Sequence, residues 1–158
     1  MTTSRIILQQ CLSARLQVQP KTETDEAQFV EIGRGLIVYL CFLKGSTSET
    51  VSKLVKAALN ARLSNNDEGK LVSILELPGD VLIIPQATLG GTLKGKMMQY
   101  HRNIDKEEGQ RLYQEFVQSC IDIVKENNSN MSVKSGTYGN IQVFRTDTNG
   151  PYTHMIEL

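Results

Sequence analysis

The chain has 158 residues, a length that fits one domain built around one hydrophobic core. Lysine and arginine together number 17, as do aspartate and glutamate, so the formal net charge at pH 7 is zero. This balance argues against a protein that wraps DNA or a long duplex, which usually carries a basic excess, but it allows a small contact such as the end of an RNA.

The N-terminal residues and the cysteines indicate the compartment. Residues 1–5 have no basic stretch leading into an apolar one, so we expect no secretory signal. No apolar run approaches the ~20 residues that span a bilayer, so we expect no membrane partner. Cys11, Cys41 and Cys120 lie in apolar segments, which is typical of small buried side chains in a reducing compartment. We therefore expect a cytoplasmic protein. Because the sequence has no Cys-x-x-Cys pair and no neighbouring histidines, we also expect no metal and no cofactor.

The first half of the chain alternates between strand patterns and one helix pattern. Apolar runs and alternation predict strands over 5–12, 14–18, 28–32 and 36–43. Apolar residues at helical spacing predict a helix over 49–63, with Ser48 as its N-cap. The Asn/Asp-rich segment 65–69 lacks the ligand series of a calcium loop, so it is interpreted as a hairpin turn.

The second half repeats this mixture of strands and helix. The patterns predict strands over 72–77, 81–85, 131–134, 141–145 and 152–158, and a turn over 136–139. The glycine-containing stretch 90–103 is interpreted as a loop, and a long helix over 106–127 begins after Asp105 as its cap. Residues 1–158 are therefore expected to form a single α+β domain, with a curled, barrel-like mixed sheet and two main helices.

The first segment that suggests chemistry is Pro85-Gln86-Ala87-Thr88-Leu89, directly after an apolar strand. Proline belongs at the end or the edge of a strand, and two polar side chains follow it here. Backbone N–H groups at such a strand end can face a ligand oxygen, as in an oxyanion hole. An ordinary exit from a strand into a loop explains the same residues.

The second segment runs from Thr148 to His154 and contains Gly150-Pro151. On its own this composition is that of a common turn. An X-Pro bond is cis or trans at modest cost, so the unit can present its carbonyl groups in two directions, and the sequence leaves the isomer open. His154 lies two residues from Tyr152 on one face of the predicted strand, and a triad built on this histidine is not favoured.

Basic side chains gather in the loop after the first segment. Lys94, Lys96, His101 and Arg102 surround Tyr100, a mixture that can hold phosphate and stack a base. A solvated loop explains the same composition.

Together these segments resemble the D-aminoacyl-tRNA deacylase family, whose members carry S-Q-x-T-L and N-x-G-P-V-T at the two places. The variants P-Q-A-T-L and T-N-G-P-Y-T-H resemble those of the animal-specific tRNA deacylases, a paralogous branch of that family. Residues 31–36 are similar to the family's E-I-G-x-G-L, and residues 136–139 to its G-x-F-G. The motifs occur in the same order over nearly the whole chain.

The resemblance implies a homodimer that hydrolyses the ester between an amino acid and the terminal adenosine at the 3′ end of a tRNA. Pro85, Gln86, Ala87 and Thr88 would line the pocket, with backbone amides stabilising the oxyanion and Thr88 as the first side chain to test. Tyr138 would replace a pocket phenylalanine. Catalysis in the family is thought to enlist the 2′-hydroxyl of the RNA, which removes the need for a protein base.

The resemblance also assigns roles outside this pocket. Gly150 and Pro151 would enter the partner's pocket and screen the side chain of the substrate. Independently of the resemblance, the basic composition of the loop makes Lys94, Lys96 and Arg102 the candidate tRNA contacts.

Departures from the family pattern concern substrate choice. Pro85 replaces a serine, Ala87 replaces a frequently bulkier residue, and Gln10 stands where D-specific members carry an arginine. The loop 96–103 does not match the family's R-P-S-F stretch. In the animal-specific branch these changes accompany a trans Gly-Pro bond and admission of a small L-amino acid. The resemblance therefore implies removal of L-alanine from threonine tRNA, with glycine and D-amino acids as further substrates. The alternative is a non-catalytic module that binds a tRNA end or a protein.

Overall fold

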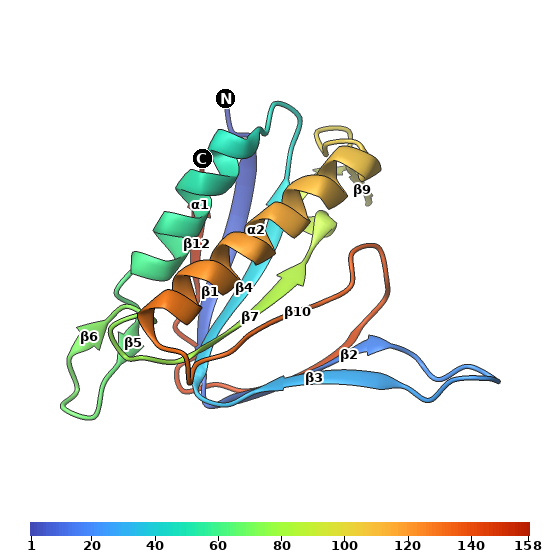
Figure 1. The fold of residues 1–158 in the computed structure, drawn as a ribbon. Helices are drawn as coiled ribbons and strands as arrows, with labels where there is room; N and C mark the ends of the chain where they lie inside the picture. Colours follow the sequence, from blue (N-terminus) through green and yellow to red (C-terminus); the bar gives the residue numbers. More distant parts are fainter.

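A computed structural model describes all residues from 1 to 158. Two helices lie side by side on one face of a five-stranded mixed sheet (Figure 1). The order across the sheet is β10 (Val133–Ser135), β7 (Asp80–Pro85), β4 (Gly35–Phe42), β1 (Ser4–Cys11) and β12 (His154–Glu157). The pairs β10–β7 and β7–β4 are parallel, whereas β4–β1 and β1–β12 are antiparallel.

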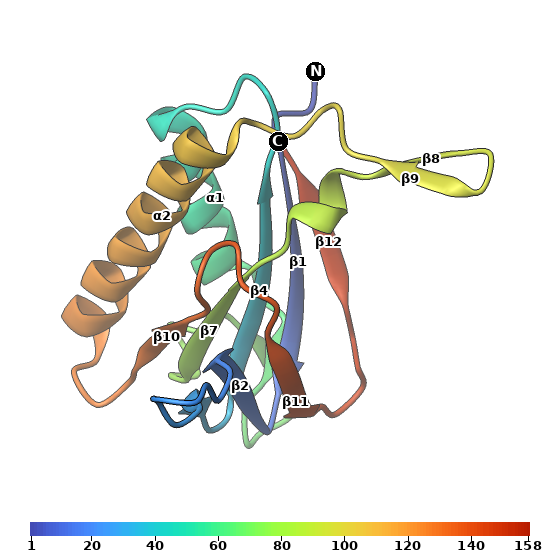
Figure 2. The ribbon, with the colours of Figure 1, turned by 90° about the vertical axis from the view of Figure 1, so that its right-hand side faces the viewer.

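A smaller antiparallel sheet lies across one end of the opposite face (Figure 2). Its order is β11 (Val143–Asp147), β2 (Ser13–Gln19) and β3 (Gln28–Ile32). Only Leu12 separates β2 from β1, so the chain passes almost directly from the large sheet into the small one. The α+β class, the mixed sheet and the two main helices are confirmed. Neither sheet closes on itself, and β10 and β12 form the edges of the large one.

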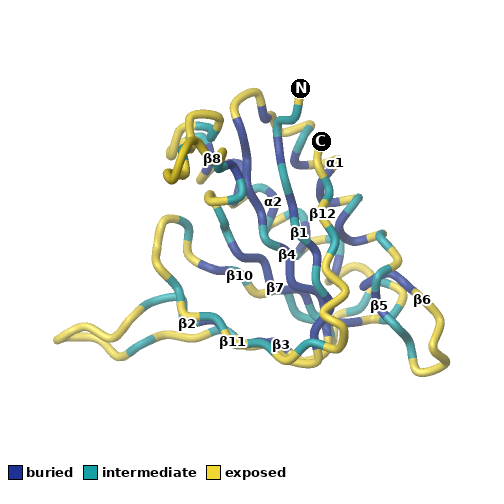
Figure 3. The backbone as a smooth tube through the Cα atoms, turned by 180° about the vertical axis from the view of Figure 1, so that it is seen from behind, coloured by how far each residue is buried: buried dark blue, intermediate teal, exposed yellow.

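Two hydrophobic clusters hold these layers together. The larger one contains 19 buried residues between the large sheet and the helices α1 (Ser48–Asn60) and α2 (Lys106–Asn127). The smaller one contains 7 buried residues between the two sheets, including Leu16, Ile37 and Leu82. Because β4 and β7 are covered on both faces along much of their length, they need the continuous apolar runs that their sequences show. Burial is concentrated in these central strands (Figure 3).

Both helices lie within a few residues of their predicted limits. Helix α2 has the expected bounds, and the Asp105 side chain accepts a hydrogen bond of 3.0 Å from the backbone N–H of Glu108. The prediction for the start of α1 was wrong: its N-cap is Thr47, whose backbone N–H donates to the Thr50 side chain at 3.1 Å. Ser48 instead donates its hydroxyl to the Glu115 carboxylate of α2 at 2.9 Å. Neither helix is long and apolar enough to cross a membrane.

Two segments differ from the predictions. The strand expected over 72–77 is only the two-residue β6 (Leu71–Val72), paired with β5 (Ser64–Asn65), and the chain then turns. The stretch 90–103, expected to be a loop, contains a hairpin of β8 (Thr92–Lys94) and β9 (Met97–Gln99). This hairpin projects from the body of the molecule (Figure 2), and Gly95 at its tip has a φ of +63°.

Candidate functional site

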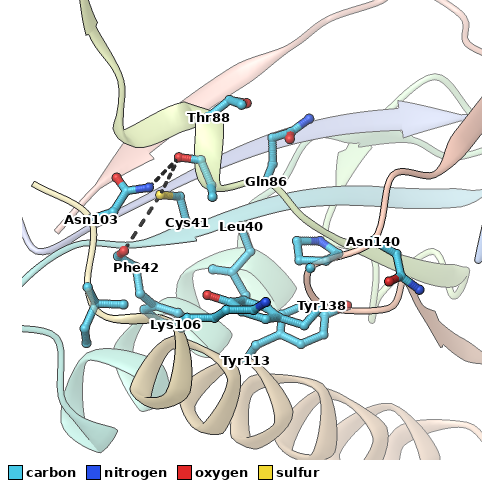
Figure 4. Close-up of a pocket in the computed structure, with 14 residues that line it drawn as sticks. Leu40, Cys41, Phe42, Gln86, Thr88, Asn103, Lys106, Tyr113, Tyr138 and Asn140 are labelled. Carbon is cyan, nitrogen blue, oxygen red and sulfur yellow. Dashed lines mark hydrogen bonds between the residues drawn. The ribbon is translucent and has the colours of Figure 1, made fainter. Parts of the chain in front are cut away.

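A cavity of about 400 Å³ opens where the C-terminal end of β7, the start of α2 and the turn after β10 meet (Figure 4). This volume lies in the range of small-molecule sites. Its lining consists of Leu40, Cys41, Phe42, Pro85, Gln86, Ala87, Thr88, Asn103, Ile104, Lys106, Tyr113, Tyr138, Gly139 and Asn140. Half of these residues are hydrophobic, and the polar ones are mostly neutral.

One wall of the cavity is the turn that follows β7. The backbone N–H of Gln86 still bonds to the carbonyl oxygen of Leu40 at 2.8 Å, after which Ala87–Gly90 form the 3₁₀ turn η1. Ala87 and Thr88 are exposed to the cavity and solvent, whereas Gly90 is buried. In Figure 4 the side chains of Gln86 and Thr88 extend on the side of the turn away from α2. The face toward α2 is therefore formed largely by small groups and backbone.

The opposite wall is aromatic. The rings of Tyr113 and Tyr138 lie with their centroids 5.6 Å apart. The Tyr113 hydroxyl donates to the carbonyl oxygen of Gly136 at 2.7 Å and lies 3.2 Å from that of Ile83. These contacts tie α2 to β7 and to the turn that carries Tyr138.

No acidic side chain and no imidazole lines this cavity. Burial raises the pKa of the Cys41 thiol to about 11. Burial is also the main reason that the pKa values of Tyr113 and Tyr138 lie above the ordinary tyrosine value. All three groups therefore keep their protons at neutral pH, and none of them is a general base there.

The structure brings five of the predicted site residues into this one cavity: Pro85, Gln86, Ala87, Thr88 and Tyr138. The remaining predicted residues lie elsewhere. Lys94 and Lys96 are exposed on the β8–β9 hairpin, and Arg102 is exposed just after it. Gly150 and Pro151 are exposed in the connection from β11 to β12 and do not line the cavity of their own chain.

The peptide bond between Gly150 and Pro151 is cis, whereas the resemblance implied trans. The sequence does not decide this because the two isomers of an X-Pro bond differ little in free energy. Gln10 is 6% exposed, and its side-chain amide donates to the carbonyl oxygen of Asn149 at 2.9 Å. The residue that replaces the family's arginine thus still contacts this turn.

Sequence reasoning missed several lining residues, notably Cys41, Asn103, Lys106 and Asn140. Cys41 was interpreted only as a buried hydrophobic side chain, and Lys106 only as the first residue of a helix. Asn103 reaches the site because residue 103 pairs with Leu43 in an isolated antiparallel bridge. No local pattern in the sequence predicts this pairing between residues that are 60 positions apart.

Comparison with known proteins identifies the family of the chain. Residues 7–157 match the family model described as D-Tyr-tRNA(Tyr) deacylase. The D-aminoacyl-tRNA deacylase 2 of Danio rerio is 52% identical over 157 residues, which are 98% of each chain. The Homo sapiens protein of that name is 54% identical over 158 residues, covering 98% of this chain and 94% of its own.

Solved structures give the same result. The structure of a probable eukaryotic D-amino acid tRNA deacylase is 29% identical, covers 100% of both chains and has a TM-score of 0.83. A c-Myc DNA unwinding element binding protein, 22% identical over 98% of both chains with a TM-score of 0.83, shows the shared fold alone. The chain therefore belongs to the D-aminoacyl-tRNA deacylase family, and within it to the animal branch formed by D-aminoacyl-tRNA deacylase 2.

Proposed function

We propose that the protein removes a mischarged amino acid from tRNA by hydrolysing the ester bond to the terminal adenosine. As a member of this family it is an aminoacyl-tRNA deacylase and a hydrolase of translation quality control. The observation that carries the proposal is the cavity itself. It is bounded by the backbone of the turn after β7, and no carboxylate and no imidazole lines it.

The proposed chemistry follows from these groups. Backbone N–H groups of Ala87 and Thr88 stabilise negative charge on the carbonyl oxygen of the ester, because preorganised dipoles act strongly where water is excluded. The N–H of Gln86 is bonded to Leu40, so Gln86 contributes by positioning the start of the turn. The 2′-hydroxyl of the terminal adenosine assists attack, so no protein base is required. Pro85 and Tyr138 bound the space for the aminoacyl group, and the apolar part of the lining holds the adenosine.

We propose that the preferred substrate is L-alanine on threonine tRNA, with glycyl-tRNA and D-aminoacyl-tRNA as further substrates. This choice rests on the resemblance of the motifs and on the small side chain of Ala87 in the lining of the cavity. It does not rest on the isomer of the Gly150-Pro151 bond, which is cis here. The test is hydrolysis of L-alanyl-tRNA, glycyl-tRNA and D-aminoacyl-tRNA under identical conditions. Cleavage of the D-aminoacyl ester alone would reject the L-alanine proposal, and cleavage of none would favour the non-catalytic binding module.

We propose that the active form is a homodimer in which Gly150 and Pro151 of one protomer complete the cavity of its partner. Both residues are exposed and lie outside the cavity of their own chain. The neighbouring edge strand β12 also exposes Met155, which is 60% accessible. An exposed edge strand with an apolar side chain is a candidate surface for association with a second chain, which would bury it.

A mixing experiment tests this shared site. One variant has a blocked cavity (Ala87→Arg), and the other lacks Gly150-Pro151. Each should be inactive alone, whereas dimers formed by unfolding and refolding them together contain one intact site. Random pairing should restore about a quarter of the wild-type rate. A mixture that stays inactive, or a wild-type chain that sediments as a monomer at working concentrations, would contradict the proposal.

We also propose that Lys94, Lys96 and Arg102 contact the phosphates of the tRNA acceptor end. They are exposed, and residues 90–103 contain no acidic side chain. Three free, buried cysteines are consistent with a cytoplasmic site of action.

A further inference from the structure

The side chain of Asn103 reaches across the base of the β8–β9 hairpin to the turn after β7. Its Nδ2 donates a hydrogen bond of 2.9 Å to the carbonyl oxygen of Ala87 (Figure 4). Its Oδ1 is buried, has no hydrogen-bond partner and lies against Gly90. A methyl group at Gly90 would overlap this oxygen. The carbonyl oxygen of Ala87 can only accept a hydrogen bond, so the amide of Asn103 is oriented with its nitrogen toward the turn.

The backbone on both sides of Asn103 is held by hydrogen bonds that do not involve the Asn103 side chain. The backbone N–H of Lys44 donates to the carbonyl oxygen of Arg102 at 2.8 Å, and that of Ile104 donates to Phe42 at 3.3 Å. Both bonds attach the segment to the end of β4, the strand that also runs beside β7. Asn103 thus connects the turn after β7 to the end of β4 in the large sheet.

A second donor approaches the same carbonyl oxygen. The Cys41 thiol lies 3.6 Å from the oxygen of Ala87 and 3.8 Å from that of Phe42. With a pKa of about 11, the thiol keeps its proton at neutral pH and acts as a donor. Thiols are weak donors, so the amide of Asn103 makes the stronger of the two contacts.

The carbonyl groups of residues 86–89 are all held by hydrogen bonds. Gln86 and Thr88 accept from the backbone N–H groups of Leu89 and Gly91 at 3.2 and 3.1 Å. The carbonyl of Leu89 accepts from Arg5 Nη1 at 2.7 Å. Because a peptide plane is rigid, fixing a carbonyl also fixes the N–H of the next residue, which points the opposite way. The Asn103–Ala87 bond thereby sets the direction of the Thr88 N–H.

We propose that Asn103 is a positioning residue for the hydrolytic reaction: it aims the backbone N–H of Thr88 at the developing oxyanion. The inference rests on the proposed function, because it assigns the orientation of the same turn. The proposed role of Asn103 runs through the one N–H of its amide that is donated to the carbonyl oxygen of Ala87. Its effect is expected on the chemical step, since misplacing an oxyanion donor by a fraction of an ångström lowers kcat while leaving ground-state binding in place.

The experiment compares Asn103→Ala with Asn127→Ala as a matched control. Asn127 ends α2 at the far end from the cavity and makes a similar bond of 3.0 Å from Nδ2 to the carbonyl oxygen of Leu75. Asn103→Ala should lower kcat for aminoacyl-tRNA by roughly tenfold or more with little change in KM. Asn127→Ala should leave both unchanged. Equal kcat values for the two variants, or a loss confined to KM, would overturn the inference.

Two further variants separate positioning from folding. Asn103→Asp keeps the size of the side chain but points an oxygen at the Ala87 carbonyl, so its kcat should fall at least as far as in Asn103→Ala. Cys41→Ala combined with Asn103→Ala should lose more than the product of the two single losses, because both groups hold one oxygen. Full activity of Asn103→Asp would reject positioning. A wild-type protein that cleaves no aminoacyl ester would instead reject the proposed function, and this inference with it.

Discussion

Gly109 of α2 lies directly against the hydroxyl group of Tyr138, and a methyl group at this position would overlap it. Ile104 Cγ2 would be 3.0 Å away. The first turns of α2 can therefore accommodate the tyrosine ring that bounds the cavity only because residue 109 has no side chain.

Gly109→Ala should lower the rate of hydrolysis, while two opposing effects act on the free energy of unfolding. Alanine favours a helix interior by about 1 kcal/mol relative to glycine, so intrinsic propensity alone would raise the free energy of unfolding. The displaced Tyr138 opposes this gain, and hydrolysis should fall because the ring moves in the cavity. Urea unfolding and kcat/KM measured on one preparation provide the check. An unchanged kcat/KM would contradict a role of this contact in shaping the cavity.

Removing the Tyr113 hydroxyl should destabilise the protein. Tyr113→Phe leaves the carbonyl oxygen of Gly136 without its 2.7 Å hydrogen bond inside the molecule, and such losses cost about 1–2 kcal/mol. Ile83 still accepts from the backbone N–H of Gly136 at 2.8 Å, which limits the loss. The measurement is the midpoint of urea unfolding, with the exposed Tyr100→Phe as a control that should not move it.

Neutralising the hairpin should weaken RNA binding. Lys94→Ala combined with Lys96→Ala should raise KM for aminoacyl-tRNA several-fold at low salt while leaving kcat unchanged. The difference from wild type should shrink as salt rises, because releasing counterions into a more concentrated salt solution is less favourable. Lys56→Ala combined with Lys125→Ala removes the same charge from exposed positions on α1 and α2 and is the control. A salt-independent effect, or an equal effect of this control, would argue against a phosphate contact.

The Cys41 thiol should make the protein sensitive to alkaline pH. Its ordinary pKa of 9.0 applies in the unfolded chain, and burial raises it to about 11 in the folded one. The folded state therefore holds this proton more tightly, which stabilises it fully below pH 9 and progressively less between pH 9 and 11. Thermal unfolding measured from pH 8 to 11 should show a smaller alkaline decline for Cys41→Ala than for wild type. Parallel declines would place the titrating groups elsewhere.

Thiol chemistry gives an independent measurement of the same burial. All three cysteines are buried and unpaired, so iodoacetamide at pH 8 should modify the native protein slowly and the urea-unfolded protein at all three positions. Rapid alkylation of native Cys41 would contradict the raised pKa.

Local signals explain which elements could be predicted. Helix α2 has the expected bounds because Asp105 caps it and apolar residues recur along one face. The β8–β9 hairpin was missed because its strands pair only with each other and carry exposed side chains such as Leu93 and Met97, so no alternation of apolar and polar residues arises.

A reciprocal pair of hydrogen bonds explains why residues 73–77 turn and do not extend the strand. The backbone N–H of Ser73 donates to the Glu76 carboxylate at 3.0 Å, and that of Glu76 donates to the Ser73 hydroxyl at 3.1 Å. This reciprocal S-x-x-E pattern is a known signature of a chain that begins to turn. The apolar side chains in the segment instead suggested a strand.

The site was predictable to the extent that it is contiguous in the sequence. Pro85 to Thr88 form one wall and could be found from a strand end alone. Asn103 and Asn140 join them through contacts between segments far apart in the chain, and such contacts follow from the whole fold rather than from any short pattern.

The bond between Asn103 and Ala87 lies at the base of the hairpin, and the exposed tip of the hairpin lies beyond it. Gly95 at the tip has no atom within 4 Å of where a side chain would begin. A fluorophore attached there through an introduced cysteine would sit at the end of a short lever, away from the ester and near the path along which we expect RNA to arrive. The hairpin tip is therefore a suitable labelling position for measuring the rate at which aminoacyl-tRNA binds.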